Sequence, residues 1–298
     1  MKKQFIILIL FAITLGFAQE KEADREKRFQ QEAGKGMDTT KPRGWQLGSI
    51  AGVNLSQVSF KDWAQGGENT LAYAMWGTAG AVNYGEKTKW ANTLKLNFGQ
   101  ARVGAQELKK TDDEIYFESL LIYLLGTTIN PYGSVTLRTQ FAPGYAYFDV
   151  APTRVQISQF FDPAYLTQSA GVAYTPYTNL TTRLGVGVRE VLTSSYPQYA
   201  DDPTTAEIEK TRVQGGLESV TDFKWPFAEN MVFTSRLEMF SPFTQMDRVI
   251  VRSDNIVAMK VNQYVTVNFN VQLINDANVS PWTQAKEALA VGLSYTLL

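Results

Sequence analysis

The stretch YVTVNFNVQLI, residues 264–274, decides the fold class. Apolar side chains occupy one set of alternate positions, from Val265 to Leu273, and polar side chains occupy the other set, from Thr266 to Gln272. A period of two places these sets on opposite faces of an extended strand. The stretch therefore predicts a β-strand that separates an apolar environment from a polar one.

The same alternation recurs along the chain, for example in NTLKLNFG (92–99), LTTRLGVGVRE (180–190) and MVFTSRLEMF (231–240). From Gly44 onward the periodicity shows no amphipathic helix longer than about three turns. Counting the alternating runs gives about twelve strands, several of them long enough to cross a bilayer when tilted. The predicted strands are 45–58, 68–84, 88–101, 113–129, 132–149, 165–176, 179–192, 208–224, 230–240, 247–260, 263–275 and 287–298.

The links between these runs alternate in length. Links such as YGEKTK, NPYG and KVNQ are short, whereas SFKDWAQGG, VAPTRVQISQFFDP and TSSYPQYADDPTTAE are longer and polar. Short turns at one end and long loops at the other are typical of an outer-membrane barrel. We predict an all-β fold for residues 44–298, a transmembrane antiparallel β-barrel with short periplasmic turns and longer extracellular loops. A secreted soluble sandwich or propeller is the alternative, since its strands would alternate in the same way.

The first residues predict export. MKKQFIILILFAITLGFA, residues 1–18, has two lysines, a short apolar run and small residues at Gly16 and Ala18, as in a secretory signal peptide. Residues 19–43 are charged and nearly free of large apolar side chains, which predicts a flexible charged periplasmic arm. We expect the chain in the outer membrane of a Gram-negative bacterium, with both termini in the periplasm.

The composition excludes several kinds of chemistry. The chain has no Cys and no His, so it lacks the usual zinc ligands and the imidazole acid or base of many enzymes. We therefore expect no enzyme, no metal site and no cofactor. The formal charge of -1 gives no basic footprint for nucleic acid. The pairs Asp112-Asp113 and Asp201-Asp202 could bind a divalent cation, although solvated charge in long loops is the ordinary interpretation.

Charged residues recur on the faces predicted to point inward. A ring of such charges in a barrel selects solutes by sign and size, so the sequence favours a channel or transporter for small polar solutes. Alternatively, the charges pair with each other and fill the lumen, and the barrel is a non-conducting structural or interaction subunit of an envelope complex. The candidate residues are Lys95, Arg138, Arg183, Arg189, Glu218, Asp222, Arg236, Glu238 and Arg252.

The stretch NLSQVSFKDWAQGGENT, residues 54–70, carries a resemblance to a known family. It resembles the N-x-S-Q-x-S-x-x-x-W-x-x-G-G-x-N opening of a Gram-negative outer-membrane β-barrel family of unknown function. The resemblance implies contact with outer-membrane lipid and insertion by the barrel-assembly machinery, with an envelope protein as a further candidate partner. The chain departs from many such barrels by ending in Leu298 rather than an aromatic residue. The matching residues are Asn54, Ser56, Gln57, Trp63, Gly66, Gly67 and Asn69.

Two further expectations concern aromatic residues. Trp63 should anchor the first loop by burying its ring, while Gly66 and Gly67 let the backbone turn back into the second strand. Tyr and Trp near the strand ends fit the interfacial girdles of a membrane barrel. The residues expected there are Trp45, Tyr84, Trp90, Tyr132, Tyr174, Tyr177, Trp225, Tyr264 and Trp282.

Overall fold

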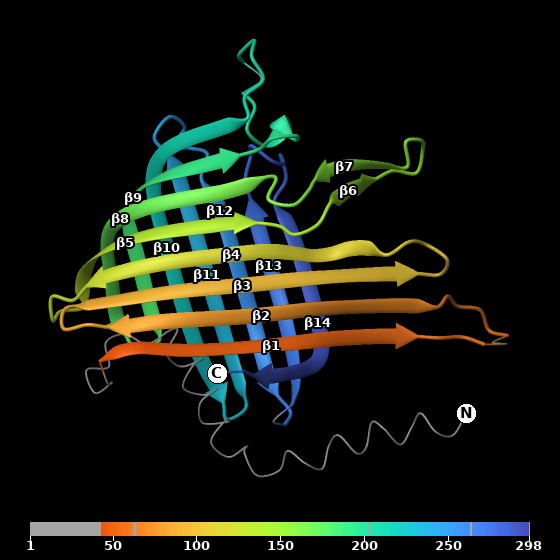
Figure 1. Ribbon diagram of the computed structural model, residues 1–298, viewed down its shortest axis with the longest axis horizontal. Helices are drawn as coiled ribbons and strands as arrows, with labels where there is room; N and C mark the ends of the chain where they lie inside the picture. The colour runs from red at the N-terminus through yellow and green to blue at the C-terminus, as the bar shows by residue number, and fades with distance from the viewer. Residues whose placement is uncertain (1–42, 62–63, 203, 263, 298) are drawn as a thin grey trace.

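The computed structural model describes residues 43–61, 64–202, 204–262 and 264–297. In this part of the chain, twelve strands close into an antiparallel barrel (Figure 1). The predicted signal peptide, most of the predicted arm and Trp63 lie outside the described residues. The barrel strands are β1 (Gly44–Val58), β2 (Thr70–Tyr84), β3 (Thr88–Val103), β4 (Lys109–Tyr123), β5 (Ile129–Thr139), β8 (Ala164–Tyr177), β9 (Leu180–Leu192), β10 (Thr211–Ala228), β11 (Met231–Pro242), β12 (Ile250–Lys260), β13 (Val265–Asn275) and β14 (Gln284–Thr296).

The prediction of a closed all-β barrel is confirmed, but the boundary between its fourth and fifth strands was wrong. The predicted turn NPYG lies inside β5, and the chain instead turns at 124–128. Gly126 has a φ of +78° there, a conformation that glycine adopts without steric cost. The strand predicted at 113–129 therefore ran through this turn and ended too late.

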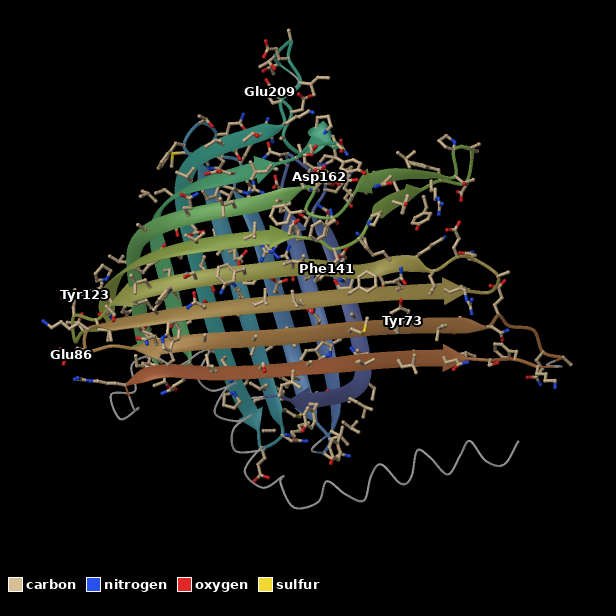
Figure 2. The ribbon with its side chains drawn as sticks, viewed as in Figure 1. Tyr73, Glu86, Tyr123, Phe141, Asp162 and Glu209 are labelled. Carbon is tan, nitrogen blue, oxygen red and sulfur yellow. The ribbon has the colours of Figure 1, made fainter. Side chains whose placement is uncertain are left out.

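The connections differ in length at the two ends of the barrel, as predicted. One end, here called the short-turn end, carries the links 85–87, 124–128, 178–179, 229–230 and 261–264. The opposite, long-loop end carries the links 59–69, 104–108, 140–163, 193–210, 243–249 and 276–283. Figure 2 places Tyr123 and Glu86 at the short-turn end and Asp162 and Glu209 at the long-loop end.

Two small elements lie in the long loops. The predicted strand 132–149 ends early, at Thr139, and the loop that follows forms a separate two-stranded sheet of β6 (Gly144–Tyr147) and β7 (Arg154–Ser158). Figure 1 shows this sheet projecting beyond the barrel wall. A short 3₁₀ helix, η1 (Pro197–Tyr199), lies between β9 and β10. No described helix is long and apolar enough to cross a membrane.

The outer surface of the barrel is apolar. Leu47, Leu55, Leu184, Leu289 and Leu293 are each more than half exposed and point away from the lumen. A water-soluble barrel would bury such side chains, whereas lipid accommodates them. The alternation read from the sequence therefore separates an apolar exterior from a polar lumen.

Aromatic rings surround the short-turn end of this exterior. The rings of Trp45 and Trp90 lie 5.4 Å apart, and Trp225, Tyr174 and Tyr177 are also exposed there. This arrangement matches an interfacial girdle. Tyr132 was assigned to the girdle wrongly, because its side chain points into the lumen and is only 5% exposed.

The seam between the first and last barrel strands is short. The β1–β14 ladder pairs only Ile50 to Asn54 with Gly292 to Thr296, although both strands continue toward the long-loop end. In Figure 1, the final part of β14 bends to run beside β1, while its first part follows β13. At the end of this ladder nearest the long loops, Gly292 permits the close approach of Asn54. A Cβ on residue 292 would overlap the Asn54 side chain.

Candidate functional site

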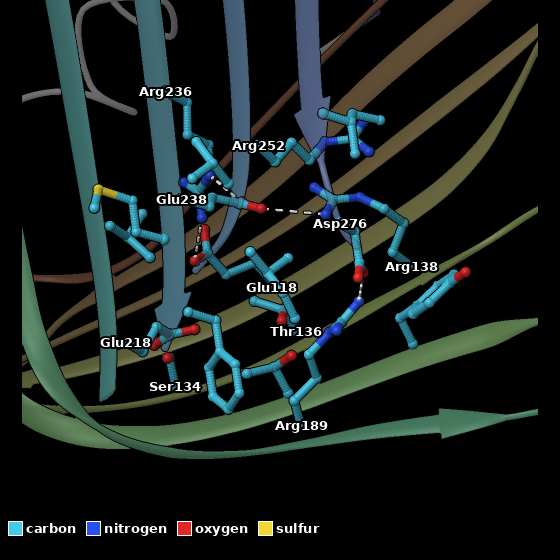
Figure 3. Close-up of a pocket in the computed structure, with 18 of the residues that line it drawn as sticks. Glu118, Ser134, Thr136, Arg138, Arg189, Glu218, Arg236, Glu238, Arg252 and Asp276 are labelled. Atoms are coloured by element: carbon cyan, nitrogen blue, oxygen red, sulfur yellow. Dashed lines mark hydrogen bonds and ion pairs between the residues drawn. The ribbon is translucent and has the colours of Figure 1, made fainter. Parts of the chain in front are cut away.

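The lumen contains a cluster of arginines and carboxylates centred on Glu118 (Figure 3). Glu118 Oε1 accepts hydrogen bonds from Arg183 Nη2 at 2.6 Å and from Arg236 Nη2 at 2.8 Å. Arg236 also donates to Asp222 at 2.9 Å and to Glu238 at 2.7 Å. Charged groups that leave water need such partners, and here each guanidinium faces at least one carboxylate.

A second group of ion pairs lies nearer the long-loop end. Arg138 donates to Glu114 at 3.0 Å and to Glu238 at 3.1 Å. Arg252 donates to the same Glu114 at 2.8 Å and to Asp254 at 3.1 Å. Glu238 is therefore shared by Arg138 and Arg236, which joins the two groups into one network.

This network spans the lumen. Glu114 and Glu118 are on β4, whereas Arg252 is on β12, which is six places from β4 in the ring of twelve strands and so belongs to the opposite wall. Strand β4 can supply both carboxylates because Asp112, Glu114, Tyr116 and Glu118 share its inward face at a period of two.

Tyr116 supplies an aromatic face to the cations of the network. Its side chain is 3% exposed, and its hydroxyl accepts a hydrogen bond from Arg236 at 2.9 Å. The Arg138 guanidinium lies 4.8 Å from the ring centroid and Lys95 Nζ lies 5.4 Å from it. Cation–π attraction at such distances stabilises the two positive charges in a partly dehydrated lumen.

The structure places all nine predicted lumen charges on inward faces. The ion pairs above join Arg138, Arg183, Asp222, Arg236, Glu238 and Arg252. Lys95 packs against Tyr116, Arg189 pairs with Asp276, and Glu218 forms no ion pair with any described residue. Their part in solute selection stays a prediction.

Sequence reasoning missed the carboxylates at the centre of this network. Glu114 and Glu118 lie in the predicted strand 113–129, in which the apolar run LLIYLL, residues 120–125, hides the alternation. The alternation DDEIYFES, residues 112–119, was the available signal. Asp112 and Asp113 lie within β4 and not in a loop as predicted, and they pair with Lys286 and Lys110, respectively.

The lumen is packed more tightly beside one wall than beside the other. Inward side chains of β4, β5, β9 and β10 are buried, among them Tyr132, Arg183 and Val220. Along β2, β12 and β13, on the other side, inward side chains such as Thr78 and Asn270 are only half-buried. The lumen is therefore filled on one side and remains accessible on the other.

Two cavities flank the network. One, of 430 Å³, lies toward β3, β13 and β14 and is lined by Lys95, Asn97, Asn270 and Gln272. The other, of 230 Å³, lies toward β8, β9 and β10 and is lined by Arg183 and Glu218, among others. Among the residues the structure describes, no group of three or more His, Cys, Asp or Glu side chains forms a metal site.

Buried carboxylates hold the long loops against the barrel mouth. Asp162, which is 4% exposed, accepts hydrogen bonds from the backbone N–H groups of Ser194 and Ser195. Asp276, which is 3% exposed, accepts from Arg189 at 2.8 Å and thereby ties the β13–β14 loop to β9 across the lumen. These contacts order the rim of both cavities.

The first loop carries part of the family-like motif. Gly66 and Gly67 have φ values of +77° and +129°, in agreement with the predicted turn. The Asn69 side chain accepts a hydrogen bond from the Phe60 N–H at 2.7 Å, and the Phe60 ring lies where a Cβ on Gly67 would fall. The Phe60 side chain therefore packs against the glycine turn.

The loop between β9 and β10 contains the clearest shift in acidity outside the strands. Hydrogen bonds from the Thr205 hydroxyl and the Asp202 N–H lower the pKa of Glu209 to about 2. The pKa of Asp202 is likewise lowered, by hydrogen bonds from the hydroxyl and N–H of Thr204. Both carboxylates act as turn acceptors within this loop.

Comparison with known proteins gives two family matches. The family described as "Protein of unknown function (DUF3078)" matches residues 55–145, and that described as "Protein of unknown function, DUF481" matches residues 169–297. No curated protein matches the chain. The matches agree with a barrel of a family without assigned function, while the motif of the first loop remains a resemblance.

Several solved structures share the barrel architecture at low similarity. The translocator domain of the autotransporter NalP from Neisseria meningitidis is 13% identical, with a TM-score of 0.39, and the match covers 92% of this chain and 95% of that one. An outer membrane channel from Pseudomonas putida F1 is 10% identical, with a TM-score of 0.40 and coverages of 89% and 97%. The NanC porin is 8% identical, with a TM-score of 0.40 and coverages of 84% and 100%.

The fold and the lumen together define the class of protein. A closed antiparallel barrel with an apolar exterior, a girdle of aromatic residues and a charged lumen is a barrel of the transmembrane type.

Proposed function

We propose that the protein is an outer-membrane barrel that conducts small polar solutes along one side of its lumen. The observation that carries this proposal is the asymmetric packing of the lumen. The charged network reaches from β4 to β12, but inward side chains are tightly packed only beside β4, β5, β9 and β10, whereas the half-buried polar side chains of β2 and β13 line the other side. Polar lining and nearby fixed charges are what a selective pore requires.

The location follows from the same surfaces. The apolar exterior and its aromatic girdle suit a lipid bilayer, and the short turns would face the periplasm with both chain ends. Barrel-assembly machinery would insert the chain, and outer-membrane lipid would surround it. Folded protein should therefore fractionate with the outer membrane and require detergent for extraction.

Planar bilayer recordings of the purified protein test the pore itself. The proposal predicts discrete, stable conductance steps whose cation-to-anion selectivity changes when Lys95 is replaced by Glu. Thr111→Ser, at the rim of the lumen, serves as the control. Ala79→Glu would be unsuitable, because it places a charge in lipid. A lack of any conductance from correctly folded wild-type protein would contradict the proposal.

A second function, as an interaction subunit, is favoured by the projecting β6–β7 sheet. Its hairpin and the segment that follows expose apolar side chains at the long-loop end, including Phe148 at 51%, Val150 at 76% and Phe160 at 63%. Exposed apolar groups of this kind mark protein contacts. Co-purification of a stoichiometric envelope protein that is lost on deleting residues 145–157, from a barrel without conductance, would select this alternative.

A further inference from the structure

Two buried groups in the lumen have polar atoms without partners. Arg183 is 1% exposed, and although its Nη2 donates to Glu118, its Nε and Nη1 bond to no described residue. Glu218 is 9% exposed, and its Oε2 is also without a partner. Burying unsatisfied charged groups is costly, so these atoms point to a ligand that would complete their bonds.

Both groups belong to the same cavity. Arg183 and Glu218 line the 230 Å³ cavity, together with the hydroxyl-bearing side chains of Ser134 and Thr136 (Figure 3). Glu218 on β10 lies opposite Gly185 on β9, two residues from Arg183, so the two side chains share one inward face. The cavity therefore presents a positive donor and a negative acceptor side by side.

The cavity also has an apolar part. Phe240 lies directly opposite Glu218 in the β10–β11 ladder and is 6% exposed. Its ring lies over Gly216 and Gly187, where a Cβ on Gly216 would come within 2.7 Å of it. Ile250 and Ile274 complete this wall.

We propose that this cavity binds an α-amino acid zwitterion with an apolar side chain. The ligand carboxylate would accept from Nη1 of Arg183, and its ammonium group would donate to Oε2 of Glu218, both as charge-assisted hydrogen bonds. The apolar side chain would lie against Phe240 and Ile250. This assignment deepens the proposed function, on which it rests, by naming the class of solute.

Binding of L-leucine to the detergent-solubilised, folded protein tests the assignment by calorimetry, without any need for conductance. We expect binding of L-leucine at least tenfold tighter than that of 4-methylpentanoate, 3-methylbutylamine or glycine. These compounds lack the ammonium group, the carboxylate and the apolar side chain, respectively. Equal binding of leucine and any one of the three, or binding of glucose but not leucine, would overturn the proposal.

A pair of variants of β10 locates the site. Glu218→Gln keeps the shape of the side chain and should weaken leucine binding at least tenfold. Lys224→Gln removes another charge of the same strand, near the short-turn end and not lining this cavity, and should leave the affinity within twofold. Unchanged affinity in Glu218→Gln would overturn the site. If Glu218→Gln does not fold, the comparison of ligands on the wild-type protein still decides.

The outcomes separate this inference from the proposed function. Selective leucine binding without conductance would support the site and contradict the channel. Conductance without leucine binding would support the channel and overturn the site.

Discussion

The carboxylate of Glu118 holds two arginines that reach it from different strands, with side-chain exposures of 1% for Arg183 and 14% for Arg236. Removing one partner of a buried charge pair leaves an uncompensated charge, which typically costs about 3–5 kcal/mol. Glu118→Leu should lower the free energy of unfolding by about that amount, measured by denaturant unfolding in detergent. Asp222→Asn is the control, because its side chain is 37% exposed and should cost under about 1 kcal/mol. Equal losses would contradict the central position of Glu118.

A charge on the outer face should be far worse than one on the inner face of the same strand. Val267 points to the exterior and Asn268 to the lumen, where Ala258 and Ala290 leave room beside it. Val267→Arg should cost about 2–4 kcal/mol if it lies near the bilayer midplane, while Asn268→Arg should be tolerated. Refolding into lipid vesicles followed by unfolding in denaturant measures both. Similar stabilities would mean that the faces of β13 are assigned incorrectly.

The low pKa of Glu209 predicts how the contribution of its hydrogen bonds to the β9–β10 loop depends on pH. Because its pKa in the folded protein is lowered from 4.5 to about 2, its contribution to the loop is complete above pH 4.5 and is lost as the pH falls through about 2. The carboxyl carbon of Glu209, followed by NMR, should titrate near pH 2. A midpoint near 4.5 would show that Thr205 and Asp202 do not hold it in solution.

At the scale of elements, the seam between β1 and β14 is the feature that distinguishes this barrel wall. Its ladder stops at Asn54 and Gly292. Beyond that pair, toward the long-loop end, the facing edges of β1 and β14 are not paired with each other. Unpaired backbone edges are costly in lipid, and water from the lumen would have to satisfy them. We therefore expect the barrel wall to be weakest in the part of this seam nearest the long-loop end.

The absence of cysteine from the sequence makes this seam directly testable. The double variant Val53→Cys/Leu293→Cys lies within the ladder and should form a disulfide on mild oxidation. Gln57→Cys/Leu289→Cys occupies the position that the ladder would reach if it continued for three more residues, on the same face as the first pair, and it should remain reduced. Oxidation followed by non-reducing electrophoresis compares them. Equal cross-linking of both pairs would show that the seam is closed along its length.

At the scale of the whole molecule, local sequence patterns predicted the strands of the barrel wall better than the contacts among side chains in the lumen. The alternation in residues 264–274 and 180–190 assigned inner and outer faces correctly, because each side chain of a strand alternates independently of distant contacts. The β4–β5 turn was misplaced because Asn-Pro-Tyr-Gly is a strong local turn signal that the tertiary pairing of β5 with β8 overrode.

The candidate site shows why the rest could not be read from sequence. Each charge could be placed on an inward face, but Arg252 and Glu114 are 138 positions apart and meet only because the barrel closes. The tighter packing beside one wall of the lumen likewise depends on which side chains reach across it. The unsatisfied atoms of Arg183 and Glu218 are visible only once every neighbouring partner is in place.

The central claim, a solute path along the open side of the lumen, is tested most directly by modifying single cysteines during conductance recordings. Asn270 faces that side and lines the 430 Å³ cavity, whereas its neighbour Phe269 points outward and is 39% exposed. Asn270→Cys and Phe269→Cys are each recorded in planar bilayers before and after addition of a charged, membrane-impermeant methanethiosulfonate. The account predicts a stepwise fall in the conductance of Asn270→Cys and no change for Phe269→Cys. Unchanged conductance of Asn270→Cys, after mass spectrometry confirms its modification, would contradict a path along this side of the barrel.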